Sequence, residues 1–426
     1  MDLRPQPALI IAMTLVAWCL PAPSLIAEQP AAAEEAAITE RPEDPAVRLT
    51  GLVTDTANHP MTPVTRPAPG EGFIDPEFGT RIVRITNARP GGVIKPMYST
   101  IPAWNCDESL LLLWNRDTGH VLYDGRTYEF IKVLDIDPTD LEHVIWDTSD
   151  PNIIRFPAVE RIGGARRARL YRYNVVTEEA EVIYDFTADG LAGDGFGLGT
   201  DPMFTSWDSA VWGLAASEDR CFTFNARTME IGGTAATEDA VVATPGPSGQ
   251  RFYLDGVVYD FEMNRVLDLG LRIPEHASIG RLPNGHDAYF SVQYDTEPNG
   301  TLVAFDMTTG EVSVLVGPEN GYPYPPAGTH ISAVAYRNPS MIAVSIIGFQ
   351  ADGQSLLDNE LLLVNTATGK VARVAHHHSL GRHGDFGYWA EPHVVISPTG
   401  TRLLFGSDWG GDSVDTYVVE LPGYGE

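Results

Sequence analysis

A short run of β-forming residues that ends in Asp or Asn and a tight turn recurs along the chain roughly every 35 to 60 residues. The turn residues of the six copies are Asp124, Asn174, Asn225, Asp260, Asp306 and Asn365. Asp and Asn tolerate the backbone angles of a sharp reversal, so each copy predicts a hairpin. A repeat of this length is typical of the blades of a β-propeller.

A second family of turns precedes these hairpins. Its seven copies, rich in Asp, Asn, Pro, Ser and Gly, occupy residues 105–108, 149–152, 217–219, 247–249, 283–285, 338–340 and 397–400. Two hairpins in each repeat predict four-stranded antiparallel units. We therefore expect an all-β fold, a seven-bladed β-propeller. Two β-sandwich domains, which also use short strands and Gly/Pro turns, are the alternative.

The count of turns leaves the last blade one strand short. Residues 416–421 form its last strand-like run, whereas the strand-like residues 81–86 have no partner of their own. Pairing this N-terminal strand with the last blade would close the ring and remove two exposed sheet edges. We expect the propeller to occupy residues 72–426 and to be closed in this way.

The N-terminal region has the pattern of an export signal. Arg4 precedes an apolar run, residues 8–20, that is too short to span a bilayer. We expect a signal peptide over residues 1–27 and a periplasmic or secreted protein, with a lipoprotein anchor at Cys19 as the alternative. Residues 28–71 lack apolar periodicity and predict a flexible linker. No later segment is apolar enough to predict a membrane span.

Charge and cysteine content exclude several classes of partner. The formal net charge is -29 at pH 7, and phosphate binding needs an excess of Lys and Arg, so we expect no nucleic-acid partner. Cys106 and Cys221 are the cysteines left after removal of the signal, which leaves room for one disulfide. Two cysteines are too few for a zinc site whose ligands are two pairs of cysteine thiolates.

Histidines recur a few residues before the first turn of several blades, at His143, His276, His330 and His393. The innermost strands of a propeller line its channel, so residues that begin these strands converge on one face. Imidazole suits both divalent-metal binding and proton transfer near neutral pH. A ring of hydrogen-bonded structural histidines is the alternative.

A second polar group lies just before the last inner strand. It consists of three consecutive histidines, His376, His377 and His378, followed by Arg382, His383, Asp385, Tyr388, Trp389 and Glu391. The group predicts cations and aromatic rings above the channel mouth, where an anionic sugar would bind. A solvated histidine-rich loop is the alternative, and three histidines on one strand must point to alternate faces.

The last two blades carry Leu-Val-Asn-Thr-Ala-Thr-Gly at residues 363–369 and Ser-Pro-Thr-Gly-Thr-Arg-Leu-Leu-Phe at residues 397–405. These strand and turn sequences resemble those of the TolB-type β-propeller superfamily, and the resemblance covers most of residues 81–421. The histidines of consecutive late blades resemble those of the oligogalacturonate lyases and, more loosely, of the propeller ulvan lyases. The resemblance implies β-elimination on oligo- or polysaccharides that contain uronic acid.

The same resemblance implies roles for individual residues. It makes His276 the general base, and it makes His330 and His393 ligands of a manganese or similar divalent ion that binds the substrate carboxylate. The family has a His-x-His pair in its last blade with a Gln shortly before it. This chain has Glu391 and Tyr388 in the corresponding places, and Glu391 would supply an oxygen ligand.

β-Elimination needs a base at the C5 proton of the uronate and positive charge against its carboxylate. We expect Arg251, Arg382 or a bound metal to supply that charge, and Tyr388 to protonate the leaving oxygen. A non-catalytic cell-envelope propeller that binds a protein or glycan partner is the alternative function. A serine hydrolase is not expected, because the chain has no Gly-x-Ser-x-Gly motif.

Overall fold

A computed structural model describes residues 49, 51–200, 204–270, 276–293, 300–322, 329–348, 350–422 and 424. All of these residues belong to the compact unit Asp44–Glu426. The predicted signal peptide, residues 1–27, and the first part of the predicted linker, residues 28–48, lie outside the described residues. No helix among the described residues is long and apolar enough to cross a membrane.

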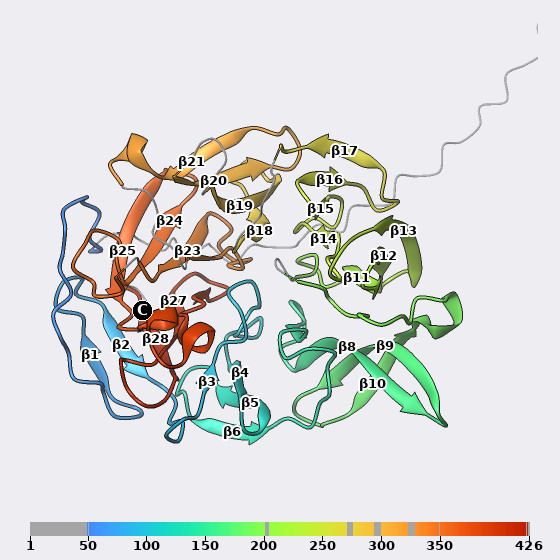
Figure 1. The fold of residues 1–426 in the computed structure, drawn as a ribbon, viewed down its shortest axis with the longest axis horizontal. Helices are drawn as coiled ribbons and strands as arrows, with labels where there is room; N and C mark the ends of the chain where they lie inside the picture. Colours follow the sequence, from blue (N-terminus) through green and yellow to red (C-terminus); the bar gives the residue numbers. More distant parts are fainter. Residues whose placement is uncertain are drawn as a thin grey trace, which may run out of the picture. The chain divides into compact units, whose positions relative to one another are not determined.

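The described residues form seven antiparallel sheets arranged in a ring, so the chain is an all-β, seven-bladed propeller (Figure 1). The first four sheets consist of β3 (Ile94–Lys95), β4 (Leu110–Asn115), β5 (Gly119–Asp124) and β6 (Phe130–Val133); β7 (Ile145–Trp146), β8 (Ile153–Ile162), β9 (Ala165–Asn174) and β10 (Ala180–Asp185); β11 (Val211–Ser217), β12 (Arg220–Asn225) and β13 (Glu230–Ala236); and β14 (Thr244–Pro245), β15 (Phe252–Leu254), β16 (Val257–Tyr259) and β17 (Arg265–Asp268). The last three consist of β18 (Ser278–Arg281), β19 (Asp287–Gln293), β20 (Thr301–Asp306) and β21 (Val312–Val316); β22 (His330–Ser332), β23 (Met341–Ile346), β24 (Glu360–Asn365) and β25 (Lys370–His376); and β26 (Val395–Ile396), β27 (Arg402–Ser407), β28 (Asp415–Glu420), β2 (Arg81–Arg84) and β1 (Gly72–Ile74). The described part of the chain also contains four short 3-10 helices, η1 (Phe186–Asp189), η2 (Pro318–Asn320), η3 (Gly381–His383) and η4 (Gly387–Ala390).

The recurring Asp and Asn residues form the turns between the last two strands of their repeats, such as β5 and β6 or β12 and β13. The Asp124 carboxylate accepts hydrogen bonds from the backbone N–H groups of Arg126 and Thr127 at 2.8 and 2.7 Å. The side chains of Asn174, Asn225, Asp306 and Asn365 accept from the residues two and three positions further on in the same way. A side-chain oxygen thus replaces the partner that each reversing backbone lacks, which explains the repeated residue type.

One predicted first turn belongs to a different hairpin. Residues 217–219 connect β11 to β12, and the reversal before β11 is instead made at residues 206–209, where Ser206 N donates to Val211 O. Among the described residues before this reversal, Gly197 forms a bridge to Ala215 of β11, and Gly193 N donates to Ala216 O at 2.8 Å. Gly195 and Gly199 have positive φ, so the backbone at these two positions is not extended.

The last sheet contains N-terminal strands. β2 pairs antiparallel with β28, with Arg81 opposite Glu420, and β1 adds a fifth strand outside β2. Residues 51–71, which the composition placed in the linker, lie against the propeller. Arg66 forms an ion pair with Asp415, a carboxylate that also accepts from Arg84 at 2.9 Å. Ion pairs of this kind attach the segment to the last sheet, although its composition is typical of an unstructured linker.

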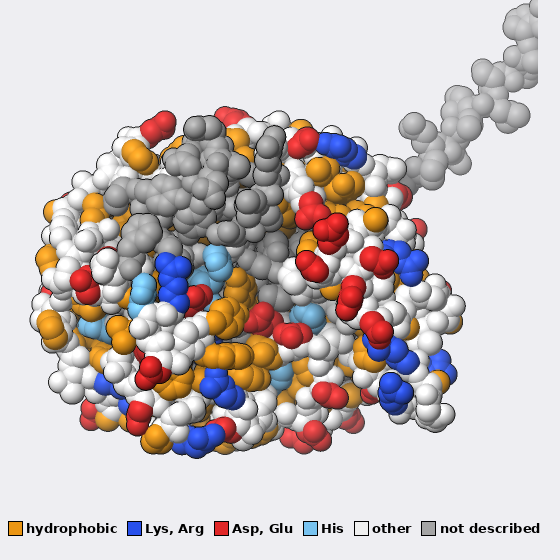
Figure 2. Space-filling view, viewed as in Figure 1, with side chains coloured by type: hydrophobic (Ala, Val, Ile, Leu, Met, Phe, Trp, Pro, Cys, Tyr) orange, Lys and Arg blue, Asp and Glu red, His pale blue; other side chains and the backbone are white. Residues whose placement is uncertain are grey.

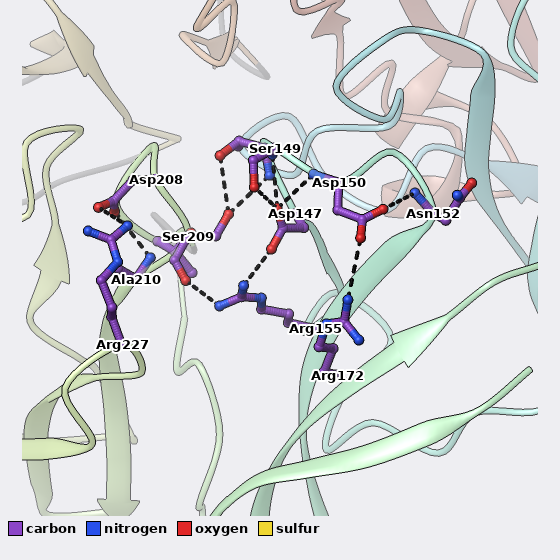
Figure 3. Close-up of polar contacts among 12 residues, drawn as sticks. Asp147, Ser149, Asp150, Asn152, Arg155, Arg172, Asp208, Ser209, Ala210 and Arg227 are labelled. Carbon is purple, nitrogen blue, oxygen red and sulfur yellow. Dashed lines mark hydrogen bonds and ion pairs between the residues drawn. The ribbon is translucent and has the colours of Figure 1, made fainter. Parts of the chain in front are cut away.

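Adjacent sheets are joined at their turns by buried polar networks. Between the second and third sheets, Arg155 donates to Asp147 within its own sheet and to Ser209 O of the next sheet at 2.7 Å (Figure 3). Asp147 also accepts from the backbone N–H of Ser149 at 2.9 Å, which keeps the turn before β8 in place. The guanidinium therefore fastens two sheets that share no strand pairing.

Large apolar residues fill the space between the sheets. Trp104, Trp146 and Trp212 are fully buried, and each indole N–H donates to a backbone carbonyl at 2.9–3.2 Å, so their burial leaves no donor unpaired. Cys106 and Cys221 are both free thiols, and they belong to turn and strand segments of different sheets. The structure therefore contains no disulfide between them.

Candidate functional site

Three of the predicted histidines meet at the start of the inner strands of three successive sheets. His276 lies two residues before β18, His330 is the first residue of β22, and His393 lies two residues before β26. The ring centroids of His276 and His330 are 4.3 Å apart, and those of His330 and His393 are also 4.3 Å apart. The propeller thus gathers imidazoles from three distant parts of the sequence into one cluster.

The backbone at this cluster is strained. His276 and His393 have φ of 53° and 42°, in the left-handed region that side chains rarely adopt. Such residues cost about 1–3 kcal/mol each and persist where the surrounding structure enforces them, often at binding and catalytic sites. Figure 2 shows the centre of one face of the ring as a hollow where histidine, acidic and apolar side chains lie close together.

Glu391 completes a potential metal-binding group with two of these histidines. Its Oε2 lies 3.5 Å from His330 Nε2 and 3.7 Å from His393 Nε2. One ligand atom from each of the three residues lies within 4.8 Å of the other two. Burial holds the pKa of His393 well below its usual range, so this imidazole is neutral, as a metal ligand must be.

The donor set fits a divalent transition metal. Two imidazole nitrogens and one carboxylate oxygen suit zinc or manganese, and His393 Nε2 has no hydrogen-bond partner among the described residues. Burial raises the pKa of Glu391, while Lys95 and Arg382 oppose that rise. His330, Glu391 and His393 are therefore the residues that would hold an ion here.

Two residues of the first sheet, which the sequence did not single out, join the cluster. Lys95 Nζ lies 2.5 Å from His393 Nδ1, and the Tyr98 hydroxyl lies 3.2 Å from His276 Nδ1. The Tyr98 ring also contacts the rings of His393 and His330, with centroids 4.9 and 5.6 Å apart. Lys95 is the last residue of β3, the inner strand of the first sheet, and Tyr98 lies three residues after it.

The charge on Lys95 decides which nitrogen of His393 is free. A charged ammonium donates to Nδ1 and leaves the hydrogen of the neutral ring on Nε2, facing Glu391. An uncharged amine can accept from Nδ1–H instead, which leaves Nε2 with a lone pair for a metal. Burial lowers the pKa of Lys95 to about 7, so both arrangements are accessible near neutral pH.

Tyr388 covers this cluster from η4. Its ring lies 4.8 Å from the His393 ring and 5.1 Å from Lys95 Nζ, and its hydroxyl donates to Glu142 at 3.1 Å. Burial raises the pKa of Glu142 to about 7, against the opposing effect of Lys95. A carboxyl group and an amine that both exchange protons near neutral pH therefore lie beside the Tyr388 phenol.

An aromatic surface adjoins this group. Trp389 stacks on Trp114 with ring centroids 5.1 Å apart, and the Arg116 guanidinium lies over the Trp389 ring at 4.7 Å. Stacked indoles beside a cation are suited to the apolar face and the carboxylate of an acidic sugar. The exposed Arg382 in η3 is close enough to act electrostatically on Glu391.

Other predicted residues lie elsewhere. Arg251 is in the turn between β14 and β15, at the opposite end of β14 from where an inner strand begins, and it donates to Gln250 O. Its positive charge favours the ionised forms of Asp260 and Asp287. His143 is a structural histidine, because its ring nitrogens contact Thr139 Oγ1 at 2.7 Å and Gly199 O at 3.0 Å.

The consecutive histidines are buried in the sheet and do not form a loop over the channel. His377 contacts Ile346 O at 2.9 Å through Nε2, and His378 stacks on Trp409 with ring centroids 4.1 Å apart. His376 at the end of β25 faces Asp75 and Glu77. The three side chains alternate in direction, as expected for a strand.

The comparisons with known proteins support the fold. No family model and no curated protein matches the chain. The structure of an oligogalacturonate lyase in complex with manganese superposes with a TM-score of 0.57 at 17% identity, covering 83% of this chain and 96% of that one. An oligogalacturonate lyase from Vibrio parahaemolyticus gives a TM-score of 0.58 at 14% identity, covering 84% and 97%. The chain is thus a seven-bladed propeller that resembles the oligogalacturonate lyases in fold.

Proposed function

We propose that this protein is a polysaccharide lyase that cleaves oligo- or polysaccharides containing uronic acid by β-elimination. The observation that carries the proposal is the convergence of His276, His330 and His393 with Glu391 at the start of three inner strands. The fold likeness to oligogalacturonate lyases supports the same reaction class. An acidic oligo- or polysaccharide is accordingly the proposed substrate.

His276 is the proposed general base. When its Nδ1 carries the ring hydrogen and donates it to the Tyr98 oxygen, 3.2 Å away, the basic lone pair of the ring is on Nε2, the proposed proton acceptor. Transfer of the C5 proton to this nitrogen leaves an electron pair that forms the C4–C5 double bond and breaks the bond from C4 to the glycosidic oxygen. Tyr388, which is hydrogen-bonded to Glu142, is the proposed donor of a proton to that oxygen.

Positive charge must stabilise the carboxylate while the C5 proton leaves. Lys95 and Arg382 both act on Glu391 electrostatically, so their charges reach the same small region. A divalent ion such as Mn²⁺, held by His330, His393 and Glu391 while the Lys95 amine is uncharged, would supply positive charge to the substrate carboxylate in place of Lys95. These local cations oppose the formal net charge of -29, whose long-range repulsion is screened over about 8 Å at physiological salt.

The test is an ultraviolet absorbance assay for the unsaturated uronate product, with polygalacturonate, oligogalacturonates and ulvan as substrates and Mn²⁺ present. The wild-type chain is expected to produce the absorbing product from one of them. His276→Ala is expected to lower the rate about 10²- to 10⁴-fold, the usual contribution of a general base.

His286→Ala is the matched control, because this histidine contacts Asp306 in a turn away from the cluster. Its activity is expected to equal that of the wild type. Equal activities of His276→Ala and the wild type would refute the proposed base. Binding of an acidic glycan in calorimetry without any absorbing product would favour a non-catalytic propeller that binds a glycan.

A further inference from the structure

A second cluster of metal-ligating side chains lies at the outer part of the propeller, where the turn between β1 and β2 meets the end of β25. It consists of Asp75, Glu77 and His376, with one ligand atom of each within 4.8 Å of the others. His376 is 1% exposed and Asp75 is also 1% exposed. The cluster shares no residue with the group at His330, Glu391 and His393.

The spacing within this cluster is too long for hydrogen bonds and suitable for a bridging ion. His376 Nδ1 lies 3.7 Å from Glu77 Oε2 and 4.0 Å from Asp75 Oδ2. A hydrogen bond is not formed at such distances. Two ligands that each lie about 2.1 Å from one zinc ion are at most about 4.2 Å apart, so all of these separations are compatible with a common ion.

The facing side-chain atoms of His376 and Glu77 lack other partners. Both ring nitrogens of His376 and the Oε2 atom of Glu77 are buried and have no hydrogen-bond partner among the described residues. Leaving buried polar atoms unpaired is costly, and native proteins usually avoid it. An unpaired imidazole directed at an unpaired carboxylate oxygen is therefore a feature that a bound cation would explain.

Hydrogen bonds to neighbouring groups hold the two carboxylates in position. Glu77 Oε1 accepts from the Thr62 hydroxyl at 2.5 Å, which turns Oε2 towards His376. Asp75 accepts the backbone N–H groups of Glu77, Phe78 and His376, each at 2.9 Å. Such outer contacts are what orients the ligands of metal sites in proteins.

Charge balance also favours a cation. The cluster places two carboxylates against one imidazole. The nearest buried guanidinium, Arg373, forms an ion pair with Glu360 at 2.6 Å. His59, also near His376, contacts Asp55 at 2.9 Å. The two carboxylates thus lack a dedicated counter-ion among the described residues.

We propose that Asp75, Glu77 and His376 bind a divalent transition-metal ion, zinc in the first instance, that clamps the N-terminal segment to β25. One nitrogen and two oxygen ligands suit zinc. The ion would join two regions about 300 positions apart in the sequence, as the hydrogen bond from His376 N to Asp75 already does. The role is structural and does not depend on lyase activity.

The test measures zinc binding to the untagged full chain by equilibrium dialysis, with Zn²⁺ alone as the probe. Glu77→Gln preserves the shape of the side chain. It is expected to weaken the binding of one equivalent of zinc at least about 100-fold. Glu71→Gln, which removes an exposed carboxylate of the same segment, is the matched control and is expected to bind zinc as the wild type does.

His393→Ala removes a ligand of the other group and distinguishes the two sites. The equivalent of zinc that Glu77→Gln no longer binds tightly is expected to remain bound in His393→Ala. His376→Gln is a second variant of the new site and is expected to lose the same equivalent as Glu77→Gln, while circular dichroism checks that each variant is folded. Unchanged zinc binding in folded Glu77→Gln and His376→Gln would overturn the proposal, whatever the result for His393→Ala.

Discussion

His377 makes the protein's stability depend on pH in a way that its contacts specify. The side chain is fully buried, its Nε2 lies 2.9 Å from Ile346 O, and its Nδ1 accepts the Ser379 N–H at 3.1 Å. The carbonyl requires a hydrogen on Nε2, and the N–H requires a lone pair on Nδ1. Protonation of Nδ1 would therefore break a buried hydrogen bond and create a buried charge.

The size of the effect follows from the pKa. Burial lowers the pKa of His377 to about 3, whereas a histidine in the unfolded chain titrates near 6.5. Between these values the unfolded state binds the additional proton, so the free energy of unfolding falls as the pH falls below about 6.5. At pH 5, which is about 1.5 units below the unfolded pKa, the loss from this residue is about 2 kcal/mol.

The substitution His377→Gln isolates this contribution. A glutamine amide offers a donor for Ile346 O and an acceptor for Ser379 N, but it does not titrate. Urea unfolding at pH 7 and pH 5 gives the loss of unfolding free energy for each chain. The variant is expected to lose about 2 kcal/mol less than the wild type over this interval.

His383→Gln is the control, because its imidazole is exposed in the folded chain. It is expected to lose as much unfolding free energy as the wild type between pH 7 and pH 5. The reasoning would be refuted if His377→Gln and the wild type lost equal amounts, since His377 would then take up a proton equally well in both states.

Further predictions concern the N-terminal segment and the histidine cluster. Asp415→Asn leaves the guanidinium groups of Arg66 and Arg84 without their shared carboxylate and is expected to lower the unfolding free energy by about 3–5 kcal/mol in urea at pH 7; a loss below about 1 kcal/mol would contradict this. Glu391→Gln is expected to weaken Mn²⁺ binding at least about 10-fold in titration calorimetry, and unchanged affinity would exclude Glu391 as a ligand. Lys95→Met removes a buried positive charge next to His393 and is expected to tighten Mn²⁺ binding, so weaker binding would argue against the proposed site.

The strand and turn pattern was predictable from the sequence because it is local. Asp124 and Asn174 form their turns with backbone groups two and three residues away, so the residue type itself reports the reversal. The exception is the turn at residues 217–219, which connects β11 to β12, one hairpin later than the sequence predicted. Local signals mark a turn but do not say which two strands it joins.

The candidate site was predictable in part. Equivalent positions in a repeat converge on one axis, which is why His276, His330 and His393 could be grouped from their places before the inner strands. The same argument failed for His143, which is enclosed by Thr139 and a backbone carbonyl. Residues at the same position of each blade lie near the start of an inner strand. The neighbouring loops decide which groups each side chain contacts.

The sequence by itself determined the architecture, because hairpin turns and strand alternation depend on residues close together in the chain. Only the tertiary structure brought Lys95 within 2.5 Å of His393 and placed His376 opposite Glu77. These pairs are about 300 positions apart, and no local pattern encodes a contact between strands that meet only after the ring has formed. The chemistry of both clusters therefore comes from the packing of sheets against one another.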